Sequence, residues 1–328
     1  MEFPSFFGRG SRDLHWAPLQ EGDIVDVIAP ASKTTDEAVK GAVRFLTSWN
    51  LKPRVSKKMF GRELFTANTD DNRLKFLLDA FNAKDSKAIW CVRGGYGTNR
   101  LLPALFKARR PSGAPKLLIG LSDITSLHAF VNQHWGWPTV HGPLLDRLGR
   151  KLAKKNHLAE LHDVLFGEIP EITFAGLKPL NPAARKSGVI RAPVTGGNLI
   201  TLQSLIGTPC GWRTKNRILF FEEIGEKGYR VDRALEHFRQ SGHFEHALAV
   251  VLGDFTDCVE ADGSKKLVPA ALKRFAESVK IPVFSGLQSG HDVVQRPVPL
   301  ETSAELYLGA KGRLVCQTGA SLIAGAAR

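Results

Sequence analysis

The first half of the chain alternates short apolar runs with longer segments of helical periodicity. Residues 24–29, 88–92 and 116–120 are mainly apolar runs of strand length, interrupted only by Asp26 and, at the start of the last run, by Lys116. Between the first two runs, apolar residues recur at the spacing of one helix face, at Leu74, Leu77, Leu78 and Phe81. Because strands that alternate with helices form parallel sheets with helices on their faces, this pattern predicts an α/β fold.

Two threonines mark the expected starts of the first two helices. Thr34 and Glu37 have the spacing of a capping box and precede an amphipathic segment. Thr69 is the expected cap of the next helix, since threonine is a preferred N-cap residue. A third helix is expected from Ile124 to about Trp135.

The pattern weakens from residue 166 to residue 191, where three prolines stand among isolated charges. The rest of the chain has more short apolar runs, at residues 217–221, 247–252 and 303–308. We therefore expect three parts: a Rossmann-like parallel-sheet domain at residues 1–165, a linker at residues 166–190, and a smaller β-rich α/β domain at residues 191–328.

Composition is typical of soluble globular proteins. The 328 residues are 43% hydrophobic and 23% charged, and they suffice for two domains with separate cores. No apolar run reaches the ~18 residues of a membrane span. The first nine residues lack the basic and long apolar segments of a secretory signal. Four scattered cysteines without a C-x-x-C pair fit free thiols, so we expect a cytoplasmic protein with no membrane partner.

The chain is basic, with a formal net charge of +13. Its cations are dispersed, apart from small clusters at residues 107–110 and 150–155, and no zinc finger, RNP-type motif or long basic helix accompanies them. A solvated surface is the simplest interpretation. Attraction of an anionic substrate is the second, and we expect no nucleic-acid partner.

Ser122 stands between an expected strand and an expected helix. On this feature alone, a helix N-cap is the favoured interpretation, because serine is preferred there. The segment Gly120-Leu121-Ser122-Asp123 is not a G-x-S-x-G elbow, since residue 124 is Ile. A serine nucleophile needs a base, and the base needs an acid to orient it. The chain offers both groups further on, in Phe221-Glu222-Glu223 and Ser289-Gly290-His291-Asp292.

Glu222 and Glu223 end an apolar run, so only one of them faces the crevice beyond the strand ends. The alternative is a surface pair of charges. His291 lies in a loop of small residues and is the expected base. The pair His243 and His246 has helical spacing but no third ligand nearby, so we expect no metal and no cofactor.

The glycine-rich segment Arg93-Gly94-Gly95-Tyr96-Gly97 follows another expected strand. It fails the dinucleotide fingerprint, because Arg100 replaces the last glycine, and it has no Walker A lysine. A plain tight turn is one interpretation. The other is that its backbone N–H groups, with the N–H of Asp123, stabilise an oxyanion.

Taken together, these segments resemble the LD-carboxypeptidase family of serine peptidases, which also contains the microcin C self-immunity peptidases. The resemblance covers most of the chain and includes three further motifs: His141-Gly142-Pro143, Thr195-Gly196-Gly197-Asn198-Leu199, and the segment from Tyr229 to Arg233. It implies a triad of Ser122, Glu222 and His291, with oxyanion donors at Gly95 and Asp123.

The resemblance also implies an activity. It implies a homodimer without a cofactor that cleaves the murein tetrapeptide between diaminopimelate and D-alanine during cell-wall recycling. Arg93 and Arg296 are expected to bind substrate carboxylates by forked hydrogen bonds. The alternatives are a peptidase of peptide–nucleotide antibiotics and a non-catalytic peptide-binding protein. The chain departs from the family pattern at Glu223, at residues 111–115 and at residues 292–296, and the last two departures bear on substrate choice.

Overall fold

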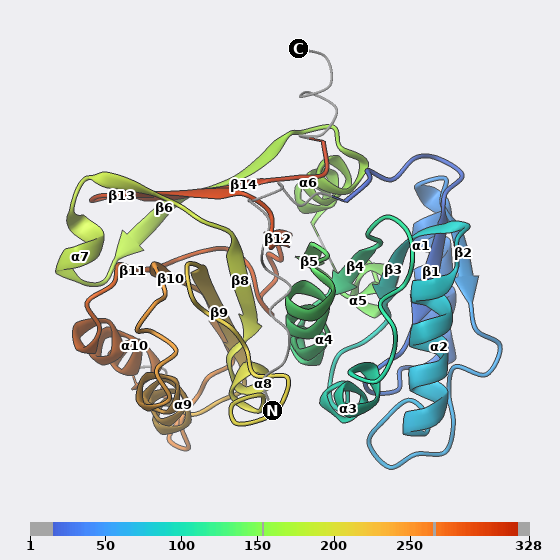
Figure 1. Ribbon diagram of the computed structural model, residues 1–328, viewed down its shortest axis with the longest axis horizontal. Helices are drawn as coiled ribbons and strands as arrows, with labels where there is room; N and C mark the ends of the chain where they lie inside the picture. Colours follow the sequence, from blue (N-terminus) through green and yellow to red (C-terminus); the bar gives the residue numbers. More distant parts are fainter. Residues whose placement is uncertain (1–15, 153, 265–266, 321–328) are drawn as a thin grey trace.

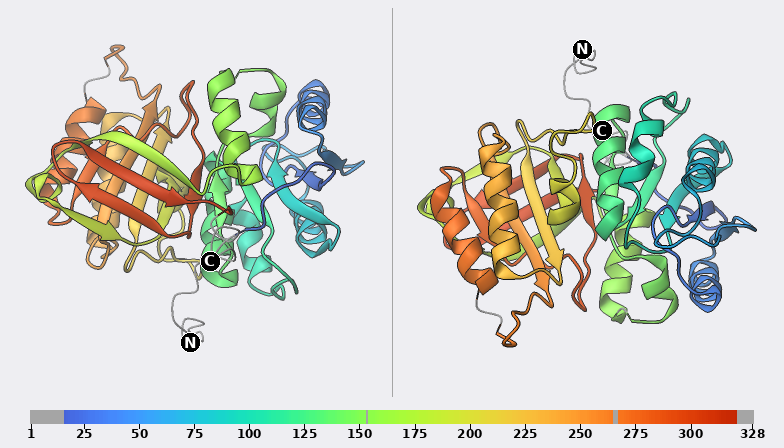
Figure 2. Two further views of the ribbon diagram at one scale, coloured as in Figure 1. Left: turned by 90° about the horizontal axis from the view of Figure 1, so that it is seen from above. Right: turned by 90° about the horizontal axis from the view of Figure 1, so that it is seen from below.

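Two sheets lie side by side in the computed structural model, which describes residues 16–152, 154–264 and 267–320 (Figure 1; Figure 2). Helices accompany both sheets, so the expected α/β class is confirmed. Residues 1–9, for which we expect no secretory signal, lie outside these ranges. Within them, no helix has both the length and the apolar character that a membrane crossing requires.

The first sheet has the strand order β12-β5-β4-β3-β1-β2. Its strands are β1 (Ile24–Ile28), β2 (Lys52–Val55), β3 (Ser86–Cys91), β4 (Leu117–Gly120), β5 (Thr139–His141) and β12 (Val298–Leu300). Strands β1 to β5 run parallel, and β12 pairs antiparallel with β5. The C-terminal part of the chain thus returns to complete the first sheet.

Alternation along the strands divides the core around this sheet in two. In β3, Ala88 and Trp90 face one hydrophobic cluster, and Ile89 and Cys91 face the other. The first cluster includes residues of α1 (Asp36–Ser48), α5 (Leu145–Gly149) and α6 (Lys155–Phe166). The second includes residues of α2 (Asp70–Asn82), α3 (Leu102–Leu105) and α4 (Thr125–Phe130). Helices therefore cover both faces, as expected for a parallel sheet.

The second sheet has the strand order β7-β13-β14-β6-β11-β10-β9-β8. Its strands are β6 (Glu171–Pro179), β7 (Gly188–Arg191), β8 (Val194–Asn198), β9 (Ile218–Ile224), β10 (Ala249–Thr256), β11 (Val283–Ser285), β13 (Ala304–Leu308) and β14 (Gly312–Gln317). Strands β8 to β11 are parallel, and the others extend the sheet antiparallel. The helices around it are α7 (Pro182–Arg185), α8 (Leu199–Gln203), α9 (Gly228–Gln240) and α10 (Leu267–Ser278) (Figure 1).

Residues 166–190 are not the linker that the sequence pattern predicted, which corrects the expected organisation. It contains β6, which pairs with β14 and β11 in the second sheet. Its isolated charges alternate with buried residues because one face of this strand is exposed. The prolines lie at the ends of elements, where Pro179 ends β6 and Pro182 begins α7.

The helix starts agree only in part with expectation. Thr35 rather than Thr34 caps α1, since its hydroxyl oxygen accepts the N–H of Ala38 at 3.2 Å. The cap at Thr69 is confirmed, with the N–H of Asn72 donating at 3.3 Å. The third expected helix is three pieces: the 3₁₀ turn η2 (Ser122–Ile124), α4, and the π turn η3 (Val131–Trp135).

Candidate active site

Ser122 follows β4 and begins η2 in a left-handed backbone conformation, with φ at +66°. Its hydroxyl makes no hydrogen bond with any described residue, so the N-cap interpretation is wrong. A left-handed conformation costs a non-glycine residue roughly 1–2 kcal/mol. The neighbouring strand end accommodates it, because a Cβ on Gly94 would lie 2.8 Å from the Ser122 Cβ. Only glycine at position 94 leaves room for the serine.

A single hydroxyl holds the glycine turn. Ser32 accepts the N–H of Tyr96 at 3.1 Å and donates to the carbonyl of Phe65 at 2.8 Å. Gly95 has φ at +101°, and a Cβ there would lie 2.5 Å from the Ser32 Oγ. The turn therefore needs glycine at position 95 both for its conformation and for this close approach.

Asp123 connects the glycine turn to the turn that carries Ser122. Its Oδ2 accepts the N–H of Thr98 at 2.8 Å, and the Thr98 hydroxyl donates to the Asp123 carbonyl. Burial raises the pKa of the Asp123 carboxyl, which those hydrogen bonds oppose. Among the described residues, the backbone N–H groups of Gly95 and Asp123 have no acceptor. Gly95 lines the same pocket as Ser122, and Asp123 follows Ser122 directly in η2.

Glu222 and His291 form a hydrogen-bonded pair at the strand ends of the second sheet, with the carboxyl buried and the imidazole partly exposed. Glu222 lies near the end of β9 and is fully buried, and its Oε2 is 2.6 Å from the His291 Nδ1. A Cβ on Gly290 would lie 3.1 Å from that oxygen, so the approach depends on glycine. Burial lowers the pKa of His291, but the charge and hydrogen bond of Glu222 outweigh burial, and the net shift is upward. The pair is arranged as a base and its orienting acid.

Glu223 faces away from this pair. Its Oε1 accepts from the Asn198 amide at 2.9 Å and from the N–H of Ile224 at 2.8 Å, and its Oε2 accepts the N–H of Ile200 at 3.0 Å. Burial raises the pKa of Glu223 to about 7. The side chain thus anchors the start of α8 from a buried position, and the surface-pair interpretation is wrong.

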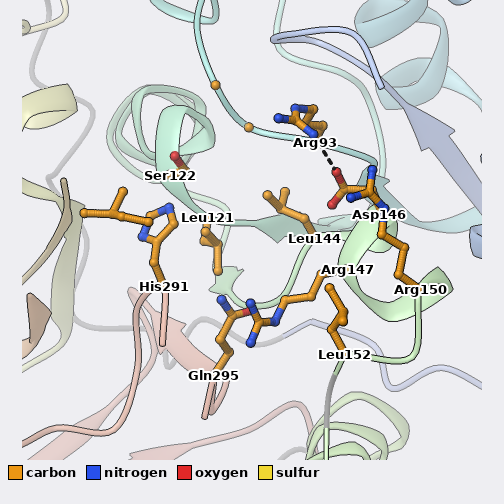
Figure 3. Close-up of a pocket in the computed structure, with 13 residues that line it drawn as sticks. Arg93, Leu121, Ser122, Leu144, Asp146, Arg147, Arg150, Leu152, His291 and Gln295 are labelled. Carbon is orange, nitrogen blue, oxygen red and sulfur yellow. Dashed lines mark hydrogen bonds and ion pairs between the residues drawn. The ribbon is translucent and has the colours of Figure 1, made fainter. Parts of the chain in front are cut away.

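Ser122 and His291 line one pocket of about 300 Å³ between the two halves (Figure 3). In this structure no hydrogen bond joins their side chains. Catalytic hydrogen bonds are often longer in the free enzyme than in the complex with substrate. Serine, imidazole and carboxylate, predicted from segments far apart in the sequence, therefore meet at one place.

The two arginines expected to bind substrate differ in position. Arg93 lines the pocket and pairs with Asp146 at 3.2 Å. Arg296 is absent from the lining, and its guanidinium is bound to Glu160 at 2.7 Å and lies over the ring of Phe174. The expected substrate role of Arg296 therefore has no support in the structure.

Four polar lining residues were not proposed as site residues from the sequence: Asp146, Arg147, Arg150 and Gln295. Arg147 lies within α5 and Arg150 directly after its end, shortly after the motif His141-Gly142-Pro143. Their position after a strand end was the available signal, because ligands of parallel sheets lie there. Within the part of the chain that the structure describes, no cluster of three His, Cys, Asp or Glu side chains could hold a metal, and His243 with His246 gains no third ligand.

Two models of one known protein family match the two halves of the chain. The N-terminal domain of the LD-carboxypeptidase family matches residues 25–142, and its C-terminal domain matches residues 191–306. The chain belongs to the LD-carboxypeptidase family. The resemblance seen in the sequence is thereby confirmed, as is the expectation of a peptidase.

Individual relatives cover nearly all of the chain. The murein tetrapeptide carboxypeptidase of Pseudomonas aeruginosa is 31% identical over 91% of this chain and 97% of its own. The microcin C7 self-immunity protein of Escherichia coli is 27% identical over 88% of this chain and 92% of its own. The crystal structure of muramoyltetrapeptide carboxypeptidase from Oxalobacter formigenes has a TM-score of 0.75 at 28% identity, and the match covers 90% and 98% of the two chains.

Proposed function

We propose that the chain is a serine carboxypeptidase that hydrolyses the bond between diaminopimelate and D-alanine in the murein tetrapeptide, with Ser122 as nucleophile. The observation that carries this proposal is the hydrogen bond between the buried Glu222 carboxyl and His291, with Oε2 and Nδ1 2.6 Å apart, and the pocket that His291 shares with Ser122. The name of the 31% identical relative supports the choice of substrate.

The reaction begins when His291 Nε2 removes the Ser122 proton and Oγ attacks the peptide carbonyl carbon. The N–H groups of Gly95 and Asp123 stabilise the negative oxygen that forms. The C–N bond then breaks, and His291 gives its proton to the leaving amine. Water repeats the sequence on the acyl-enzyme, releasing the tripeptide carboxylate and free Ser122. Throughout, Glu222 holds Nδ1 and stabilises the imidazolium.

Hydrolysis of a peptide–nucleotide antibiotic is a second candidate, because a self-immunity protein is among the relatives. Incubation with a synthetic tetrapeptide and, separately, with an aminoacyl-sulfamoyl nucleotide distinguishes the two. Mass spectrometry should show tripeptide plus D-alanine from the first compound. Cleavage of the nucleotide alone would refute the murein assignment.

Non-catalytic peptide binding is tested at the same serine. A fluorophosphonate should add covalently to Ser122, detected as a mass shift on the peptide that contains it. A protein that binds the tetrapeptide but neither cleaves it nor reacts with the probe would be a binding protein.

The proposal extends to the cellular setting. A recycled tetrapeptide is met in the cytoplasm, which fits four buried thiols among the described residues. A homodimer is expected from the family resemblance. Light scattering of the full chain should give twice the mass of 36.0 kDa, and a monomer at micromolar concentration would refute this part.

A further inference from the structure

The pocket beside Ser122 is unequally charged. Its lining has three arginines, Arg93, Arg147 and Arg150, and one carboxylate, Asp146. Asp146 pairs with Arg93, so the excess positive charge belongs to Arg147 and Arg150. Figure 3 shows Ser122 and His291 on one side of the pocket and the arginines on the other, with Leu121 and Leu144 between them.

Arg147 lines the pocket with a partly buried guanidinium. Its Nη2 donates to the carbonyl of Asp292 at 2.9 Å, while its Nε is buried without an acceptor. The same lining contains Gln295, whose Oε1 is buried without a donor among the described residues. Leaving a buried donor unpaired is unfavourable, so an acceptor supplied by a ligand would stabilise this arrangement. Arginine remains charged despite burial and binds carboxylates through two parallel N–H groups.

We propose that Arg147, assisted by Arg150, binds a carboxylate of the peptide substrate and so selects peptides whose reacting end is anionic. This inference rests on the proposed peptidase function and deepens it. Arg93 contributes less, because Asp146 already occupies its guanidinium. The leucines between the arginines and Ser122 suit a short aliphatic side chain such as that of alanine.

The test compares three peptides on the full-length enzyme: the free tetrapeptide, its C-terminal amide, and a tetrapeptide amidated on the diaminopimelate side chain. Arg147→Gln should lower kcat/KM on the free tetrapeptide by about 10- to 100-fold, the range for a hydrogen bond to a charged group. On one of the two amides, wild type should lose the same factor, and Arg147→Gln should lose nothing more. That amide identifies the carboxylate that Arg147 binds.

Lys151→Gln is the matched control, since Lys151 is exposed, follows Arg150 directly and does not line the pocket. It should leave kcat/KM within about twofold, because a single exposed charge contributes little. An equal loss on all three peptides would overturn the inference, since Arg147 would then act only through Asp292 and the position of His291. No loss on any peptide would also overturn it. If wild type cleaves none of the peptides, the proposed function itself fails.

Discussion

On one side of the pocket Ser122 is positioned by backbone geometry, and on the other side His291 is positioned by buried charge. The serine lies in a left-handed conformation against Gly94, and backbone hydrogen bonds to the Ser32 hydroxyl and to the buried Asp123 carboxyl tie the surrounding turns together. The histidine is held by a fully buried carboxylate, and a second carboxyl, Asp254, lies beside Gly290.

The two sides of the pocket should therefore respond differently to pH and to substitution. Backbone geometry is insensitive to pH but intolerant of an added methyl group, since packed backbone cannot move far. Buried charge tolerates small changes of shape but depends on the protonation of its neighbours. Substitutions on the Ser122 side should therefore change the rate, and those on the His291 side should also change pH dependence and stability.

The largest effect is expected for Ser122→Ala, which removes the nucleophile. We expect kcat on the tetrapeptide to fall by roughly 10⁴–10⁶-fold, because removal of a catalytic serine leaves only the residual contribution of binding and the oxyanion donors. The midpoint temperature of thermal unfolding should be unchanged or slightly higher, because, among the described residues, the Ser122 hydroxyl has no hydrogen bond that the substitution would remove. Ser48→Ala, at the exposed end of α1, is the control and should keep full activity. Wild-type turnover by Ser122→Ala would disprove the nucleophile assignment.

The neighbouring carboxyls of Glu222 and Glu223 should respond differently to the same substitution. Glu222→Gln keeps the shape of the side chain but cannot stabilise the imidazolium, so we expect a loss of about 10³–10⁴-fold in kcat. It should also lower the pKa of His291, because the charge of Glu222 is what raises it. The acidic limb of the pH–rate profile, measured on the residual activity, should therefore move to lower pH.

Glu223→Gln should behave in the opposite way. Its amide would present N–H groups to backbone donors at the start of α8, where an unsatisfied buried group costs about 1–3 kcal/mol. Urea unfolding should show that loss of stability, while kcat stays within about tenfold of wild type. If Glu223→Gln abolishes turnover in a folded protein and Glu222→Gln does not, the roles of the two carboxyls are reversed.

Gly94→Ala tests the geometric side with a single methyl group. The new Cβ would lie 2.8 Å from the Ser122 Cβ and 3.2 Å from its Oγ, so the serine must shift. A displacement of this kind costs up to about 10²-fold in rate, and we expect a 10- to 100-fold loss of kcat. Gly211→Ala is the control, since its nearest neighbour would be a carbonyl oxygen at 3.3 Å. An equal effect of the two variants would show that the Ser122 side has more room than the structure indicates.

Local patterns predicted more of the first sheet than of the second. The runs at residues 24–29, 88–92 and 116–120 correspond to β1, β3 and β4 within two residues, because buried parallel strands are nearly continuous in apolar residues. Strand β6 was missed, since its exposed face interrupts the apolar run. The pairing of β12 with β5 joins residues more than 150 positions apart, and no local signal encodes it.

The site also contains residues that the sequence predicted and features that it did not. Ser122, Glu222 and His291 could be proposed from motifs because each lies at a strand end or in a glycine-containing loop. The left-handed φ of Ser122 could not be predicted, because serine rarely adopts it and the contact with Gly94 that leaves room for it comes from another strand. Arg150 was grouped with a basic surface cluster and Arg147 was not singled out, since an arginine beside a pocket has the same local sequence as one facing solvent.

The smallest effect is expected at Asp254, whose Oδ2 is buried without a partner. Burial raises the pKa of Asp254 to about 7; the charges of Asp292 and Glu222 add to the shift, and His291 opposes it. A raised folded-state pKa means that stability is lost as pH rises from about 4 to 7, because the unfolded chain ionises first. Asp254→Asn stays neutral, so it should be more stable than wild type by about 1 kcal/mol at pH 8, after allowance for partial exposure.

That advantage of Asp254→Asn should nearly disappear by pH 4, where the wild-type carboxyl is neutral in the folded state and only about half ionised in the unfolded chain. Urea unfolding of both proteins at pH 4, 6 and 8 measures the difference, with Asp79→Asn, an exposed carboxylate on α2, as the control for charge removal. The control should differ from wild type by no more than a few tenths of a kcal/mol at each pH. A gain for Asp254→Asn that is equal at pH 4 and pH 8 would mean that Asp254 does not titrate in this range. Charge would then no longer distinguish the His291 side from the Ser122 side in its response to pH.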